Sequence, residues 1–154
     1  MPRLIDLPIE DLSHVDEHET KIAAGEGEVW DALVSTLPRM ADNGIAHRFA
    51  ALVGVQHLVP EGEFPETGAS FPGFVVARAV PPAVLALMGA HRFSRYALVF
   101  RIEKAPSGSI LRAETRAEFP GPQGRVYRTL VISSRFHVLA VRRILGLVKR
   151  RAEG

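Results

Sequence analysis

The sequence predicts an α+β domain, with a curved antiparallel sheet wrapped around a long C-terminal helix and two short helices after the first strand. Several segments alternate apolar and polar residues with a period of two, which is typical of half-buried strands. Residues 125–152 instead repeat apolar residues at intervals of three and four, which is typical of an amphipathic helix. The length of 154 residues suits a single domain over 1–154, with 1–12 as an irregular lead-in.

The composition excludes several classes of protein. The chain has no cysteine, so it has no disulfide framework, no thiolate nucleophile and no cysteine-based zinc site. No apolar run reaches the ~18 residues of a membrane-spanning helix, and the acidic N-terminal stretch lacks the apolar segment of a secretory signal. We therefore expect a cytoplasmic protein without a transmembrane segment.

Positive charge is concentrated at the C-terminal end of the chain. Residues 123–154 hold eight Lys and Arg residues against one acidic residue, whereas the remainder holds eleven basic and sixteen acidic residues. This asymmetry indicates either an anionic partner or a basic helix that lies over an acidic domain. Because charged stretches are often only solvated faces, the second interpretation is favoured.

The N-terminal part of the chain predicts one strand and two short helices. Residues 14–24 alternate polar and apolar residues, as a half-buried strand does. In "GEGEVWDALVSTLP" (25–38) the apolar residues recur at helical spacing, and Pro38 is expected to end this helix. Asn43 is a suitable N-cap for a second helix, which would run to Val53.

A run of strands follows a loop at 60–73, which is rich in Pro and Gly. A further strand could lie earlier, in "LVGVQHLV" (52–59), although this segment could equally extend the second helix. Alternation and turn residues place the strands after the loop at 74–80, 83–89, 94–103 and 110–119.

The inward side chains of the last two strands differ in size. Where small residues of a strand face a long helix, either the helix lies close to the sheet or the space between them is unfilled. The outward faces carry Arg and Glu residues, whose cross-strand ion pairs we expect to be solvent-exposed and weakly stabilising. The inward residues are Tyr96, Leu98, Phe100 and Ile102 on the first strand, and Ala113, Thr115 and Ala117 on the second.

The C-terminal helix has two apolar sides. A helix that is apolar on two sides usually packs against other structure on both sides. The second side is expected to pack against a loop, the short helices or a second copy of the chain. One expectation is therefore a homodimer formed through the back of this helix. The side expected to face the sheet comprises Tyr127, Val131, Ser134, Val138, Val141, Leu145 and Val148, and the back comprises Ile132, Phe136, Leu139 and Leu147.

Four segments carry a likeness to a known family. "HETKIAAGEGEVWDAL" leads from a first strand into a helix through a Val-Trp pair, and the closing helix follows a run of strands. "HRFSRYALVF" and "GRVYRTLVI" are typical of small uncharacterised bacterial members. Over about residues 13–152 the chain thus resembles the Bet v 1-like or START-like superfamily, also called polyketide cyclase or SRPBCC proteins.

This resemblance implies a helix-grip fold with a hydrophobic cavity between the sheet and the C-terminal helix. Members of the superfamily bind lipids, sterols, polyketides or plant hormones, and a minority catalyse cyclisation or dehydration. The superfamily usually has six or seven strands, whereas the alternation predicts five here.

Ten residues are candidates for ligand binding. Pockets of this kind are mostly apolar and have a few orienting polar groups. The alternative for each is ordinary: Trp30 and Met88 are core residues, and the polar side chains bond to backbone or water. The expected lining is Trp30, Met88, Tyr96, Phe100, Thr115, Tyr127, Val131 and Ser134, with Arg78 and His91 as polar anchors.

The two anchors have open alternatives. Arg78 interrupts an apolar strand, and it is either a buried cation that needs an anion or a solvated residue on the other face. His91 precedes a strand with an apolar inward face, so it either bonds a ligand or is a rim histidine bonded to backbone.

No metal or cofactor site is expected. His14 and His18 are four residues apart, but they lie on a strand and no third ligand is indicated. The sequence contains no nucleophile elbow, phosphate-binding loop, dinucleotide fingerprint or zinc motif.

Three functions remain. The favoured one is a non-catalytic carrier or sensor of a small hydrophobic molecule, such as a lipid or a polyketide. The second is a cyclase or dehydratase that uses His91 as general acid and base, with Tyr96 or Tyr127. The third is a basic module in which "VRRILGLVKRR" binds anionic lipid or RNA, although no aromatic residues alternate with its bases, so nucleic acid is not expected.

Overall fold

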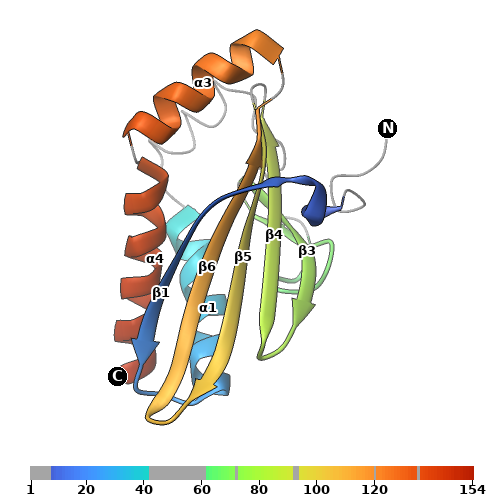
Figure 1. Ribbon diagram of the computed structural model, residues 1–154. Helices are drawn as coiled ribbons and strands as arrows, with labels where there is room; N and C mark the ends of the chain where they lie inside the picture. The colour runs from blue at the N-terminus through green and yellow to red at the C-terminus, as the bar shows by residue number, and fades with distance from the viewer. Residues whose placement is uncertain (1–7, 42–61, 72, 92–93, 120, 135) are drawn as a thin grey trace.

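A six-stranded antiparallel sheet with helices on one face forms the described part of the protein. The computed structural model describes residues 8–41, 62–71, 73–91, 94–119, 121–134 and 136–154 (Figure 1). The strands follow the order β1-β6-β5-β4-β3-β2 across the sheet, and every neighbouring pair is antiparallel. Their bounds are β1 Ser13–Ile22, β2 Ser70–Phe71, β3 Phe74–Val80, β4 Val84–His91, β5 Ser94–Ala105 and β6 Gly108–Glu118.

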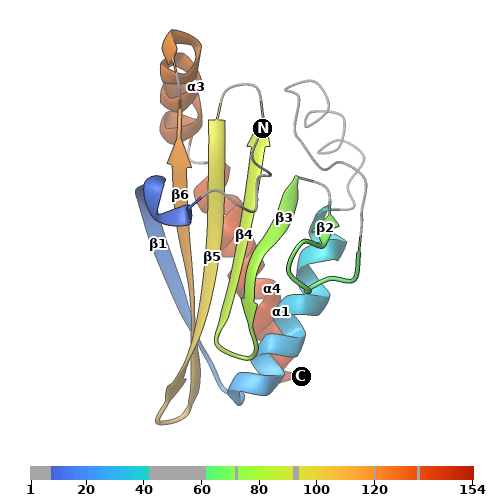
Figure 2. The same cartoon turned by 90° about the vertical axis from the view of Figure 1, so that its right-hand side faces the viewer.

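Two helices, α1 (Glu26–Ala41) and α4 (Phe136–Glu153), lie side by side on the same face of this sheet (Figures 1 and 2). A third, α3 (Gly121–Ser134), extends across the end of the sheet at a steep angle to α4 (Figure 1). The fold is therefore α+β, as the periodicity predicted, with a C-terminal helix packed on an antiparallel sheet.

The main core lies between the sheet and the two helices. Leu33 of α1 and Val148 of α4 are fully buried against Leu87 and Phe100 of the sheet. The inward residues predicted for β5 and β6 belong to this side, because Leu98, Phe100, Ile102, Leu111 and Ala113 are all members of the same buried cluster. The two-residue period thus predicted the inner face of these strands correctly.

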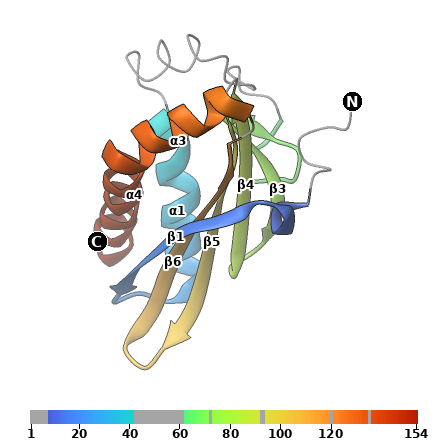
Figure 3. The ribbon, with the colours of Figure 1, turned by 45° about the horizontal axis from the view of Figure 1, so that its top comes forward.

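A second, smaller core lies on the opposite face of the sheet. Leu12 is buried there beside Val75, Met88 and Ala97, and Ile9 packs on the same cluster. Ile9 begins a short 3-10 helix, η2 (Ile9–Asp11), and β1 carries the chain from it across the sheet (Figure 3). The end of the predicted lead-in therefore covers the outer face.

The turn between β5 and β6 packs closely against the end of β1 and the loop that follows it. Gly108 has φ +143°, and a Cβ placed on it would lie 2.2 Å from the carbonyl oxygen of Ile22. The neighbouring Ser109 hydroxyl donates a hydrogen bond to the Ala24 carbonyl at 2.8 Å. Only glycine fits at this position, because any side chain would separate β6 from β1.

Three sequence predictions of elements were wrong or incomplete. The single helix over 125–152 is two helices, α3 and α4, which meet at a steep angle, and the apolar spacing, which is the same in both, did not reveal this (Figure 1). Helix α1 continues through Pro38 to Ala41, because the buried Leu37 and the packed Met40 hold its last turn on the core.

The sixth strand is the two-residue β2, which lies inside the predicted loop at 60–73. The predicted helix from Asn43 to Val53 and the alternative strand at 52–59 lie outside the described residues. No helix in the described ranges is long and apolar enough to span a membrane.

Candidate functional site

A pocket of about 470 Å³ lies where the end of the sheet meets α3 and α4. Strand β1 and the end of β6 form one wall, and residues of the two helices form the other. The lining is mixed: Val15, Ala117, Phe119 and Val138 are apolar, and Ser13, His14, Asp16, His18, Arg128 and Arg142 are polar or charged.

A β-bulge decides which side chains of β1 face this pocket. His14 pairs with Arg116 and Asp16 pairs with Thr115, so Val15 is an extra residue in β1. A bulge of this kind reverses the alternation of the strand. Before it the outward residue is His14, and after it Asp16 and His18 face inward with Thr115.

Three polar side chains therefore occupy an otherwise apolar part of the inner face. His18 Nε2 lies 3.3 Å from Asp16 Oδ2, a distance that makes an ion pair when the imidazole is protonated. The Thr115 hydroxyl is buried and has no hydrogen-bond partner in the described part of the chain. Because buried polar groups normally have partners, this cluster is suited to a polar group of a ligand.

The helices add two arginines to the pocket. Arg128 comes from α3 and Arg142 from α4, and both side chains are exposed. Neither forms an ion pair with a carboxylate within the described ranges. The pocket wall thus holds two guanidinium groups and one carboxylate, that of Asp16.

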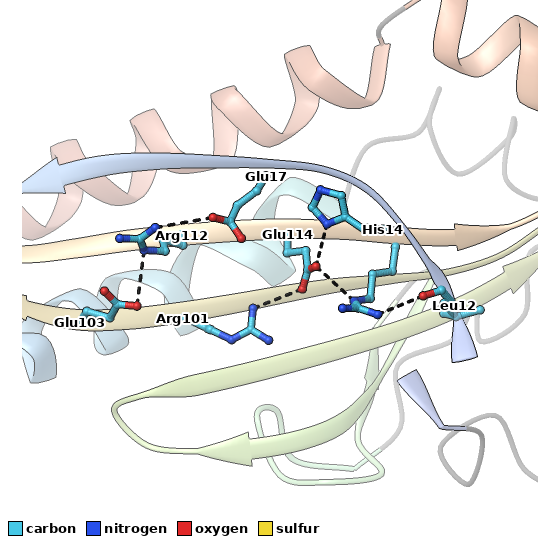
Figure 4. A network of polar contacts seen from close by, with 8 residues as sticks. Leu12, His14, Glu17, Arg101, Glu103, Arg112 and Glu114 are labelled. Carbon is cyan, nitrogen blue, oxygen red and sulfur yellow. Dashed lines mark hydrogen bonds and ion pairs between the residues drawn. The ribbon is translucent and has the colours of Figure 1, made fainter. Parts of the chain in front are cut away.

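A network on the outer face holds β1 in this position (Figure 4). The carboxylate of Glu114 accepts hydrogen bonds from His14 Nδ1 at 2.8 Å and Arg101 Nη1 at 3.3 Å, and it lies 3.2 Å from Arg116 Nε. Arg116 also donates to the Leu12 carbonyl at 3.1 Å. The segment that crosses the outer face is thereby joined to β6.

Glu114 differs from the exposed ion pairs that were predicted here. Its side chain is 8% exposed, so the prediction of weak solvent-exposed pairs was wrong at this residue. Burial raises the pKa of Glu114, but hydrogen bonds from His14, Arg116 and Arg101, with the charge of Arg116, outweigh it and lower the pKa below 4.5. The segment before β1 packs on the same outer face, where Leu12 and Ile9 belong to the smaller core.

The predicted lining residues fall into several places. Trp30 and Phe100 are buried in the main core. Tyr96 faces the same side, where its hydroxyl donates to the Gly73 carbonyl at 2.8 Å and its ring meets Phe74 edge-on at 5.4 Å between centroids. Two of the ten lie opposite pocket residues in the sheet: Thr115 pairs with Asp16, and Tyr96 pairs with Ala117.

Two predicted residues lie on the wrong face for an inner cavity. Met88 belongs to the outer cluster with Leu12, because its neighbours Leu85 and Leu87 point inward. Arg78 is exposed and pairs with Ala86, since a bulge after Val76 shifts the register of β3. The solvated alternative for Arg78 was therefore the correct one.

The other predicted residues are only partly described. Tyr127, Val131 and Ser134 lie on α3, and His91 ends β4 opposite Ser94. Their side chains lie outside the described residues, so their contacts with a ligand remain predictions.

The sequence interpretation missed Asp16, His18 and both arginines. It treated His14 and His18 as one set, whereas the bulge puts them on opposite faces. The only signal was the composition of "HVDEH", in which two histidines flank two acidic residues. Within the described ranges, no group of three or more His, Cys, Asp or Glu side chains is arranged to hold a metal ion.

Comparisons with known proteins identify the fold. No protein-family model matches the sequence, and no curated protein matches it either. Among solved structures, an uncharacterised protein from Rhizobium leguminosarum is similar with a TM-score of 0.57 at 14% identity, covering 91% of this chain and 97% of its own. The di-domain ARO/CYC protein StfQ, from the steffimycin biosynthetic pathway, has a TM-score of 0.58 at 15% identity, covering 90% of this chain and 50% of its own.

A third similar structure is Ara h 8.0201, with a TM-score of 0.53 at 9% identity over 89% of this chain and 95% of its own. The structural neighbours are Bet v 1-like and polyketide cyclase (SRPBCC) proteins, many of them structural genomics targets. The chain therefore has the helix-grip fold that the resemblance implied.

Proposed function

We propose that the protein binds a small, largely hydrophobic molecule in the pocket between β1, β6 and the helices α3 and α4. The fold is typical of hydrophobic ligand-binding proteins and of cyclases, which supports both a carrier and an enzyme. The observation that carries the proposal is the pocket itself, whose volume of about 470 Å³ lies within the range of about 300–1,000 Å³ common for ligand sites.

The small inward row of β6 accounts for the open space. Ala117 lines the pocket, and Ala113 and Thr115 precede it on the same face. Nearer the start of β6, the larger side chain of Leu111 is buried in the main core. The inner face of β6 thus changes from a packed core to a ligand site as its side chains become smaller and more polar.

An enzymatic role is the second candidate, and the residues that line the pocket change which histidine is the candidate acid and base. The proposed acid and base was His91, but the histidine whose ring lies beside a carboxylate in this pocket is His18, 3.3 Å from Asp16. An imidazole next to a carboxylate is suited to accept and release a proton. A catalytic form of the proposal therefore assigns this role to His18.

The proposal is tested by filling the pocket. Ala117→Phe places a ring in the pocket, and Ala140→Phe adds the same ring on the exposed side of α4 as a control. Native mass spectrometry of freshly purified protein is expected to show a co-purified small molecule in the wild type and in Ala140→Phe, but not in Ala117→Phe. Thermal unfolding confirms that both variants fold.

Equal loading of the Ala117→Phe variant and the wild type would overturn this location. If no molecule co-purifies with the wild type, the same three proteins are compared by titration with the neutral dye N-phenyl-1-naphthylamine. Dye binding that is unaffected by Ala117→Phe would equally contradict the proposal.

A further inference from the structure

We infer that this pocket selects molecules with an anionic group at one end of an apolar body, and that Arg142 and Arg128 bind the anionic group. This inference rests on the proposed function, because it names the class of ligand that the same pocket would take.

The charges around the pocket favour an anion. Two guanidinium groups line it against the single carboxylate of Asp16, so the wall is net positive even when both of its histidines are neutral. Asp16 already has a nearby partner in His18, whose Nε2 lies 3.3 Å away.

The two arginines have no carboxylate partner in the described part of the chain. Neither Arg142 nor Arg128 has a carboxylate partner among the described residues, whereas Lys149 on the same helix α4 lies 3.3 Å from Glu153. A planar guanidinium group can bind a carboxylate or sulfonate through two parallel hydrogen bonds. Within the described ranges, both arginines are thus exposed at the wall of the pocket with no carboxylate partner, as a site for an anion requires.

The arrangement of α4 separates the apolar part of the pocket from the charged part. Val138 and Arg142 are four residues apart, so they lie on the same side of the helix one turn from each other. Val141 and Leu145 are buried in the main core, which places Arg142 at the edge of the buried side. An apolar body beside Val138 and Ala117 would thus bring an anionic end within reach of Arg142.

Two dyes with the same aromatic body separate this inference from the proposed function. 8-Anilinonaphthalene-1-sulfonate carries a sulfonate, and N-phenyl-1-naphthylamine lacks it. We expect the sulfonate to bind more tightly than the neutral dye, by about fivefold, because exposed charge pairs contribute up to about 1 kcal/mol. This preference should fall as ionic strength rises.

The variants then assign the preference to residues. Arg142→Gln is expected to weaken binding of the sulfonate dye about fivefold and to leave binding of the neutral dye unchanged, and Arg128→Gln should act in the same direction. Arg125→Gln is the control, since it removes one positive charge from an exposed position of α3 that does not line the pocket.

Each outcome has a distinct meaning. If both dyes bind equally and no arginine variant changes this, the inference is wrong while the apolar site remains. If Arg125→Gln weakens the sulfonate dye as much as Arg142→Gln does, the preference comes from overall charge and the inference is again wrong. If neither dye is affected by Ala117→Phe, the proposed function itself fails.

Discussion

Glu114 shows how a single buried charge fixes the position of β1. Three side chains stabilise its carboxylate, and one of them, Arg116, also holds the carbonyl of Leu12. Removing one member of such a network leaves the others with incomplete partners. The residue lies on the opposite face from the pocket, yet His14, which it binds, is next to the bulge that turns Asp16 inward.

Glu114→Gln is expected to reduce the free energy of unfolding by about 1–3 kcal/mol at pH 7. The folded-state pKa of Glu114 is lowered, so its contribution is present above the unfolded value of 4.5 and is lost as pH falls through the folded value. Urea unfolding of both proteins should therefore show a difference at pH 7 that shrinks as the pH falls through the folded-state pKa of Glu114. A difference that persists undiminished in acid would contradict this account.

Gly89 is required by the ring of Tyr96. A Cβ on Gly89 would lie 2.2 Å from the Gly73 carbonyl oxygen and 2.3 Å from Cε2 of Tyr96. Gly89→Ala is expected to lower the free energy of unfolding by about 2–3 kcal/mol, because an overpacked site must shift its backbone or its ring.

Gly146 provides the matched control for this prediction. It lies within α4, and nothing would lie within 4 Å of a Cβ placed there. Gly146→Ala should stabilise the protein by up to about 1 kcal/mol through helix propensity. Thermal or urea unfolding compares the two variants, and equal effects of the same sign would show that the contact at Gly89 is unimportant.

At single residues, the sequence predicted a side chain's face only where the strand was regular. Alternation placed Tyr96, Phe100 and Thr115 correctly, because β5 and β6 pair without interruption. It left the face of Arg78 open, because a bulge precedes this residue, and it did not separate His14 from His18, because a bulge lies between them. A bulge depends on how two strands pair, so the period of either strand alone does not reveal it.

At the scale of elements, the end of α4 is joined to the end of β1. The carboxylate of Glu153 accepts a hydrogen bond from the Ala23 amide at 2.9 Å, and Lys149 Nζ donates to the Lys21 carbonyl at 2.6 Å. The hydrogen bond from Ala23, together with Lys149, lowers the pKa of Glu153. These contacts connect the helix that lines the pocket to the strand that forms its opposite wall.

Glu153→Gln should loosen this connection without unfolding the protein. We expect faster hydrogen exchange of the Ala23 amide, because a neutral amide oxygen is a weaker acceptor than a carboxylate. Arg150→Gln, on an exposed side chain of the same helix, is the control and should leave that amide unchanged. Exchange is measured by NMR, and equal rates in wild type and Glu153→Gln would refute the role of this contact.

Helix existence was easier to predict than helix extent. The apolar spacing identified both α1 and the C-terminal helical region, but it did not reveal that the latter consists of α3 and α4. A periodic pattern can continue across a kink, since both helices keep the same spacing on either side of it. In α1, packing of Leu37 and Met40 outweighed the local effect of Pro38.

At the scale of the whole molecule, the basic C-terminal region remains open to solvent. Arg143, Arg150 and Arg151 of α4 are exposed and form no ion pair with the described carboxylates, while the helix itself packs on α1 and β1. The alternative of an anionic surface as partner stays a prediction. Leu139, on the predicted dimer face, is 62% exposed, and the dimer stays a prediction.

Vesicle binding tests the basic surface formed by Arg143, Arg150 and Arg151. Vesicles that contain phosphatidylserine should bind the protein more strongly than pure phosphatidylcholine, since each arginine near an anionic membrane contributes about 1 kcal/mol. The double variant Arg150→Gln/Arg151→Gln should weaken sedimentation with these vesicles, and added salt should do the same. Equal binding to both vesicles would exclude this partner.

The fold was predictable as a whole because the order of strands and helices is set by period and by turn residues. The position of the pocket was less predictable, because it depends on how α3, α4 and the bulged end of β1 meet. Half of the residues expected to bind ligand instead fill the core, face the other side of the sheet or bond the backbone.

The most direct test of the central claim is to locate a bound molecule by NMR. During titration with N-phenyl-1-naphthylamine, the account predicts that the largest amide shifts occur at Val15, Ala117 and Val138, which line the pocket from β1, β6 and α4. Ala90 and Ala97 in the outer cluster should remain unshifted. Shifts centred on that outer cluster, or saturating binding without shifts at the pocket, would contradict a ligand site between the sheet and the C-terminal helices.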